Sequence, residues 1–273
     1  MGKHAKRTTI TVTILIAVMT VCSPAWAEEE RLPDRFMLRL GGYQIRDADT
    51  IVRLEENNQP GGAYIDFNET LGGETSATVF RLDGLYRFNE RHGIGLGSYA
   101  LKFTGSKVLD KEIDWAGRIY PANTKVDSEI KFGIYKLDYQ YSLFHNDKAE
   151  LGASFGFNIM KISTSVVAQG INQSGSRSVS APLPVWGLFA DYKFTPRLSA
   201  YYNYQFFFVN FQDKNKGAIQ DFLFGLEYRL FRNIALGAAY NRFGMQLEAK
   251  GDKATLNLDT NWNGGMLYGA VYF

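Results

Sequence analysis

Eight charged residues recur at alternate positions in segments that are otherwise rich in apolar and aromatic residues. Residues two apart in an extended chain point to the same side, so each segment would carry its charges on one face. Both signs of charge occur, which allows ion pairs between neighbouring segments. Such a set can be a polar lining that selects solutes, or a group of ion pairs that fills a narrow interior, and we favour the second. The eight are Arg39, Arg81, Asp83, Lys136, Asp138, Asp191, Glu227 and Arg229.

Residues that could support hydrolysis are few. His92 and His145 both fall in short polar segments that we expect to be turns. Asp47 and Asp49 are the one tempting acidic pair, but such a pair is typical of a solvated turn or, at best, a loose cation site. The chain has no phosphate-binding glycine loop, nucleophile elbow or metal-ligand spacing. We therefore expect no catalytic residue, no metal and no cofactor, with an enzyme that hydrolyses lipid or peptide as the alternative.

The first 27 residues have the three parts of a secretory signal peptide. The apolar run is short for a membrane-spanning helix, which needs about 20 residues. We expect cleavage after Ala27, which leaves a short periplasmic segment at 28–33 before a single domain at 34–273. The parts of the signal are the basic residues Lys3, Lys6 and Arg7, the apolar run Thr8–Cys22, and the small residues Ala25 and Ala27 at the cleavage site.

Cleavage would change the balance of charge and remove the sole cysteine, Cys22. The segment carries three basic residues and no acidic residue, so the formal charge would fall from +2 to −1. A nucleic-acid partner then has no support from composition, and neither disulfides nor thiolate metal sites are available.

Four segments repeat one pattern, in which an aromatic strand end is followed by a tight polar turn and a new alternating strand. The turns fall near 89–92, 145–147, 195–197 and 232–233, and longer polar stretches lie between them near 57–62, 106–126, 168–180, 213–217 and 249–253. Short turns at one end and longer loops at the other are typical of bacterial outer-membrane barrels, with the short turns periplasmic. Four turns and five loops predict ten antiparallel strands, with eight as the alternative.

Alternation within the predicted strands indicates which face meets lipid. In 222–230 and 135–143 one face is aromatic or aliphatic and the other is polar, so the apolar face should be outward. Tyr86, Tyr141, Tyr192 and Tyr228 all lie beside the short turns, as in an interfacial aromatic girdle. The parity of apolar residues changes between Leu96 and Tyr99, which predicts a β-bulge near Gly97 and Ser98 or a misplaced strand boundary.

The last residues, 266–273, form an alternating strand that ends on an aromatic residue. In this respect the sequence resembles bacterial outer-membrane β-barrel proteins, and its size and layout are similar to small barrels of the OmpW or opacity type. The resemblance implies that Tyr268, Tyr272 and Phe273 are an assembly signal read by the barrel-assembly machinery. Because a sheet in lipid cannot leave an edge unpaired, the last strand should pair with the strand that starts near Arg35.

These features predict an all-β protein of the outer membrane that is not an enzyme. The expected role is a narrow passage for small solutes or a structural role in the envelope, with outer-membrane lipid and lipopolysaccharide as partners. The alternatives are a hydrolase and an adhesin, of which the second would use the outer loop that carries Trp115, Arg118, Ile119 and Tyr120. Fold alone does not separate these roles.

Overall fold

The computed structural model describes residues 34–56, 63–115, 118–170, 173–211, 215–250 and 254–273. The predicted signal peptide with Ala25 and Ala27, and the segment 28–33, lie outside the described residues. The strands are β1 (Phe36–Glu56), β2 (Ala63–Asp66), β3 (Ala77–Arg87), β4 (His92–Val108), β5 (Ile113–Trp115), β6 (Arg118–Tyr120), β7 (Lys125–His145), β8 (Ala149–Ala168), β9 (Gln173–Lys193), β10 (Leu198–Phe211), β11 (Asn215–Phe231), β12 (Ile234–Lys250) and β13 (Ala254–Tyr272).

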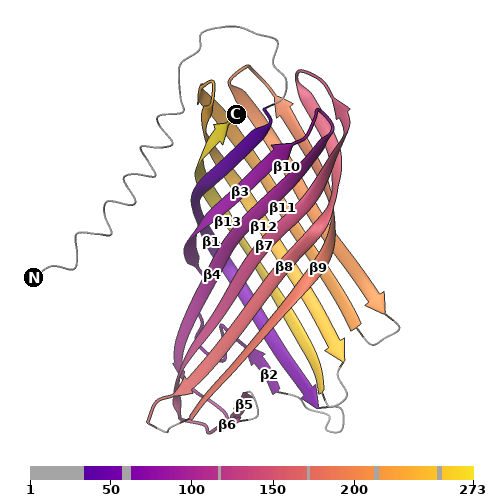
Figure 1. Cartoon of the computed structure of the whole chain (residues 1–273). Helices are drawn as coiled ribbons and strands as arrows, with labels where there is room; N and C mark the ends of the chain where they lie inside the picture. The colour runs from indigo at the N-terminus through magenta and orange to yellow at the C-terminus, as the bar shows by residue number, and fades with distance from the viewer. Residues whose placement is uncertain (1–33, 57–62, 116–117, 171–172, 212–214, 251–253) are drawn as a thin grey trace, which may run out of the picture. The chain divides into compact units, whose positions relative to one another are not determined.

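Ten long strands form one closed antiparallel sheet (Figure 1). Neighbours in the sheet follow chain order from β13 back to β7, then β4, β3 and β1, and β13 pairs with β1 to close the ring. The predicted ten-stranded barrel and the pairing of its first and last strands are confirmed. No helix in the described part of the chain is long and apolar enough to span a bilayer.

The two ends of the barrel differ in their connections. The four short turns, residue 34 and residue 273 lie at one end, which we call the turn end, and β2, β5 and β6 lie at the other, the loop end (Figure 1). The strands extend further than the sequence predicted: β8 runs to Ala168 and β9 begins at Gln173, so most of the loop expected at 168–180 is strand. The outward positions of these strand ends are mostly serine and not apolar. The alternation of apolar and polar residues that predicts a membrane strand is therefore missing there.

The outward face carries an apolar belt. On β7 the outward residues from Leu143 to Tyr135 are largely exposed and apolar, whereas Asp138 between them is buried. The same pattern on β11 exposes Phe224, Leu226 and Tyr228 and buries Glu227, as predicted. The turn-end tyrosines Tyr86, Tyr192 and Tyr228 are each close to half exposed.

The predicted bulge in β4 is wrong. Pairing of β4 with β7 runs without a shift from His92↔Tyr141 to Val108↔Lys125, so the facing of side chains never changes along the strand. Tyr99, Leu101 and Phe103 are apolar because they fill the interior, where each is at most 3% exposed. Along β4 the apolar residues move from the outward face to the inward face, because the lumen itself becomes apolar toward the loop end.

A bulge occurs instead in β1. Asp47 and Ala48 together oppose Trp262 of β13, between the pairs Arg46↔Asn263 and Asp49↔Asn261. Asp47 takes a positive φ of 51° there, a conformation that aspartate tolerates better than most residues. The Asp47–Asp49 pair is thus part of a strand, not the turn that the sequence indicated.

Pairing between β9 and β10 covers only the turn half of the barrel. It runs from Lys193↔Ser199 to Trp186↔Phe206, whereas β8 and β9 pair along almost their whole length. Pro184 and Pro182 follow Trp186 toward the loop end, and proline has no N–H to donate to a neighbouring strand. In the described residues, β9 from 173 to 185 therefore has a partner strand on its β8 side alone.

Candidate functional site

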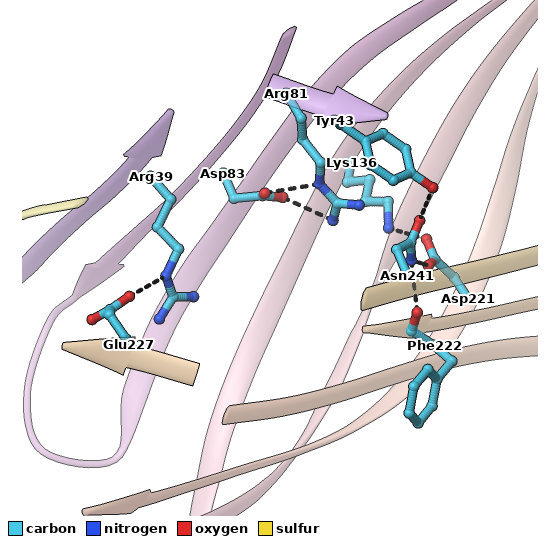
Figure 2. Close-up of polar contacts among 9 residues, drawn as sticks. All are labelled: Arg39, Tyr43, Arg81, Asp83, Lys136, Asp221, Phe222, Glu227 and Asn241. Carbon is cyan, nitrogen blue, oxygen red and sulfur yellow. Dashed lines mark hydrogen bonds and ion pairs between the residues drawn. The ribbon is translucent and has the colours of Figure 1, made fainter. Parts of the chain in front are cut away.

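The lumen is the candidate site, because the polar and charged side chains of the ten strands converge there. All eight charged residues singled out from the sequence lie on inward positions. The structure brings some of them into contacts across the barrel, among them Lys136 with Asp221 and Arg39 with Glu227 (Figure 2). Other residues of these contacts, such as Asp221 and its partner Asn241, were not singled out from the alternation of polar and apolar residues. The lumen has a polar half near the turn end and an apolar half near the loop end.

The central contact of the polar half joins β7 to β11. Lys136 donates to Asp221, and both side chains are at least nine-tenths buried (Figure 2). Asn241 of β12 also donates to Asp221 at 2.7 Å and accepts from the hydroxyl of Tyr43 at 2.8 Å. Because β7 and β11 lie on different sides of the ring, this network crosses the lumen.

Closer to the turn end, Arg39 and Glu227 form the next link across the lumen. Arg39 Nε donates to Glu227 Oε2 at 3.0 Å, and the guanidinium lies 3.9 Å from the centre of the Tyr201 ring. The hydroxyls of Tyr268 and Tyr272 donate to the same carboxylate. Two tyrosines of the expected assembly signal therefore point into the lumen, while Phe273 is 45% exposed.

The remaining predicted charges have mixed surroundings. Arg81 donates twice to Asp83 of its own strand, and Arg229 donates to Asp34. Asp138 accepts from Gln140 at 2.9 Å and from Gln205 at 3.3 Å. Asp191 faces the same space without an ion pair or hydrogen bond among the residues that the structure describes. Not every inward charge is thus directly compensated.

A group of contacting polar side chains at the turn end, which we call the turn-end hub, was not identified from the sequence. Arg87 donates both terminal nitrogens to Glu150 at 2.7 Å, and Ser142 donates to the same carboxylate. Bidentate arginine–carboxylate pairs are among the stronger ion pairs in proteins. The one signal in the sequence is position: Arg87 falls on the same face of its strand as Arg81 and Asp83.

Serine, histidine and glutamate meet in this hub, but their order does not suit hydrolysis. His145 Nδ1 lies 3.7 Å from Glu150, and Ser142 contacts Glu150 directly. In a hydrolytic triad the histidine lies between the nucleophile and the acid, so that it can accept the nucleophile's proton. Here the carboxylate lies between the other two, and Arg87 already occupies it. His92 contacts the hydroxyl of Tyr139 on the outward face, away from the lumen.

The loop half of the lumen is packed with apolar side chains. Phe132 of β7 contacts Trp262 of β13 with ring centroids 5.4 Å apart, and Trp262 stacks on Phe243 of β12 at 4.2 Å. Strands β7 and β13 are separated by three strands in the ring, so this aromatic row also spans the lumen. Aromatic contacts of this geometry contribute beyond their buried area.

Segments from the loop end cover this apolar layer. Phe67 and Leu71, which follow β2, are buried, and Ser128 of β7 donates to the Leu71 carbonyl at 3.4 Å. Tyr120 of β6 is fully buried and donates to the Val166 carbonyl at 3.1 Å. Of the four residues expected to form an adhesive loop, Arg118 and Ile119 are exposed and Tyr120 is internal. Trp115 is partly buried against the core.

No protein-family model matches the chain, and no curated protein matches it in sequence. Among solved structures, the chain is similar to the outer-membrane protease OmpT of Escherichia coli, with a TM-score of 0.53 and 11% identity over 90% of this chain and 99% of that one. Lower similarity links it to the outer membrane protein OprG of Pseudomonas aeruginosa, with a TM-score of 0.39 and 12% identity over 89% and 97% of the two chains. At 11% identity, the likeness to OmpT shows the fold alone.

The outward belt gives the location. A closed barrel is the form in which strands cross a bilayer, because closure leaves no backbone edge in hydrocarbon. The apolar belt faces outward and the charges face inward, which is the arrangement of outer-membrane barrels. The chain is an outer-membrane β-barrel protein.

Proposed function

We propose that this protein is a closed barrel with a structural role in the envelope, and that it is not an enzyme. The observation that carries the proposal is that side chains meet across the lumen at two levels. Lys136 contacts Asp221 in the polar half, and Phe132 contacts Trp262 in the apolar half. An open pore would need both levels to separate.

The arrangement of possible catalytic groups supports the second part of the proposal. The hub of Ser142, Glu150 and His145 lacks the order needed to activate a nucleophile. In β1, Asp47 forms a bulge with Ala48, Asp49 follows it, and the inward residue Ala48 carries no reactive group. In the hub, the carboxylate beside Ser142 is already paired with Arg87, and His145 does not lie between them.

Planar-bilayer recordings test the closed lumen. Purified wild-type protein should give no steady current at moderate voltage, and a large, stable conductance would contradict the proposal. Brief, small openings that depend on solute would instead support the narrow passage that the sequence also allowed.

The envelope role has its own test. A strain without the protein should become more sensitive to detergent and to bulky antibiotics, while uptake of small solutes stays unchanged. Slower uptake of small solutes with an intact barrier would contradict the structural role. Incubation of the purified barrel with peptide and phospholipid substrates should yield no cleavage.

A further inference from the structure

Three lysines lie at the loop-end border of the outward apolar belt, on three neighbouring strands. They are Lys102 of β4, Lys131 of β7 and Lys161 of β8. Lys102 and Lys131 are direct cross-strand partners, and Lys161 pairs with Gly133, the next outward residue of β7. All three side chains point away from the lumen.

Like charges placed directly opposite each other destabilise a strand pair, so the Lys102–Lys131 pair needs compensation. Glu129 supplies part of it, lying 2.5 Å from Lys102 and also in contact with Lys131. Hydrogen bonds from Lys102 and then Lys131 lower the pKa of Glu129, which keeps it ionised. The three lysines and Glu129 sum to a charge of +2, and the next carboxylate, Glu74, accepts from Thr104, the cross-strand partner of Glu129.

Lys161 is the one of the three lysines that Glu129 does not contact. Its ammonium lies 5.4 Å from the centre of the Tyr135 ring, and it has no ion pair among the described residues. Long basic side chains at a membrane border keep their stems on apolar surface and their charges in the polar region. Lys161 is therefore available to an anion at the level where lipid headgroups lie.

A polar pocket adjoins the lysines on the side away from the membrane. It has a volume of about 300 Å³ and is lined by Glu129, Lys131, Ser163, Ser165, Ser176 and Ser178. The serines come from cross-strand pairs of β8 and β9, and the hydroxyls of Ser163 and Ser178 are 3.0 Å apart. Hydroxyl groups both donate and accept hydrogen bonds, which suits the hydroxyls of a sugar.

We propose that this surface, the lysine row with the serine pocket beside it, binds the headgroup of a phosphorylated glycolipid in the outer leaflet. Along β7 and β8 the outward residues change in the order that such a lipid requires. Tyr135 and Ile159 contact the acyl chains, Lys161 and Lys131 bind phosphate, and the serines bind the sugar beyond them. A free anion would use the lysines alone, and an uncharged glycolipid the serines alone.

The test measures retention of a diphosphorylated disaccharide lipid by the full-length barrel in detergent, using native mass spectrometry over a range of lipid concentrations. Removing all three charges (Lys102→Gln, Lys131→Gln, Lys161→Gln) should weaken binding about 100-fold, at roughly fivefold for each lysine near an anionic headgroup. Glu129→Gln should strengthen binding several-fold, because it releases Lys102 and Lys131 from their internal partner.

A matched control removes three exposed charges at the turn end, Lys148, Lys193 and Arg197, each changed to Gln. This variant should bind the lipid as the wild type does, and an equal loss in both triple variants would overturn the site. Equal binding of the same lipid without its phosphates would also overturn it. Inorganic phosphate should compete only weakly, and full competition at millimolar concentration would reduce the site to one for simple anions. The site shares no residue with the lumen, so this result and the conductance result stand independently.

Discussion

Lys136 and Asp221 form a buried ion pair that joins two sides of the barrel wall. The residues are 85 positions apart in the chain, and their strands lie four steps apart in the sheet. Asp221 is held by Asn241 and by Lys136 at once. The pair thus acts as a strut across the polar half of the lumen, and its removal should affect both stability and closure.

Replacing Lys136 with Met should destabilise the barrel by about 3–5 kcal/mol, because Asp221 would remain as a buried charge without its ion-pair partner. The double variant Lys136→Met, Asp221→Leu should recover most of that loss. Urea unfolding in detergent, monitored by the difference in gel migration between folded and unfolded barrel, measures the stability of both variants. Asp191→Asn is the control, since Asp191 has no direct partner among the described residues, and it should leave stability unchanged or raise it. Equal losses in the single and double variants would mean that the pair is not a strut.

Much of the barrel is predictable from the sequence, because closure and the membrane act on local alternation. Glu227 and Arg229 alternate with Phe224, Leu226 and Tyr228, so the inward and outward faces follow from one segment. The partners of the inward charges cannot be predicted from one segment, because Lys136 contacts Asp221 only when the closed ring places their strands opposite each other. The apolar half of the lumen was misinterpreted for a related reason. A membrane barrel is expected to be polar inside, so Tyr99, Leu101 and Phe103 suggested a bulge when they belong to an internal core.

Trp262 should be the residue whose loss opens the apolar half. It is 1% exposed and contacts both Phe132 and Phe243. Trp262→Ala should cost about 3–5 kcal/mol, as for other large-to-small changes in a packed core. It should introduce measurable conductance in planar bilayers when it is combined with Lys136→Met, which opens the polar half. Trp186→Ala removes an equally large side chain from the lipid face, where Trp186 is 58% exposed. It should leave the conductance at the wild-type level. If the variant with both changes, Trp262→Ala and Lys136→Met, still gave no current, closure would not depend on these two levels.

The turn-end hub should be structural. Glu150→Gln leaves Arg87 without its bidentate carboxylate and without a countercharge, and leaves a single acceptor oxygen for Arg87 and Ser142. We expect a loss of about 3–5 kcal/mol in the free energy of unfolding. His145→Gln should have little effect, because the imidazole lies 3.7 Å from Glu150 and is partly exposed. The same urea series measures both variants. If His145→Gln were the more damaging change, the histidine would be central to the hub and the proposed order of the three groups would be wrong.

The short β9–β10 pairing should make that part of the wall the most open to hydrogen exchange. From Gln173 to Ala181, β9 has a partner strand only on its β8 side, so about half of its amides should exchange quickly. On β7, residues 126–133 pair with both β4 and β8 and should be protected throughout. Mass-spectrometric exchange of the folded barrel in detergent compares the two segments directly.

Changing both Pro182 and Pro184 to Thr restores two N–H groups on β9. If proline limits the pairing, β10 should extend its ladder beyond Phe206, and exchange in both strands should slow. Uniform protection of β9 in the wild type would show that the pairing is complete in solution.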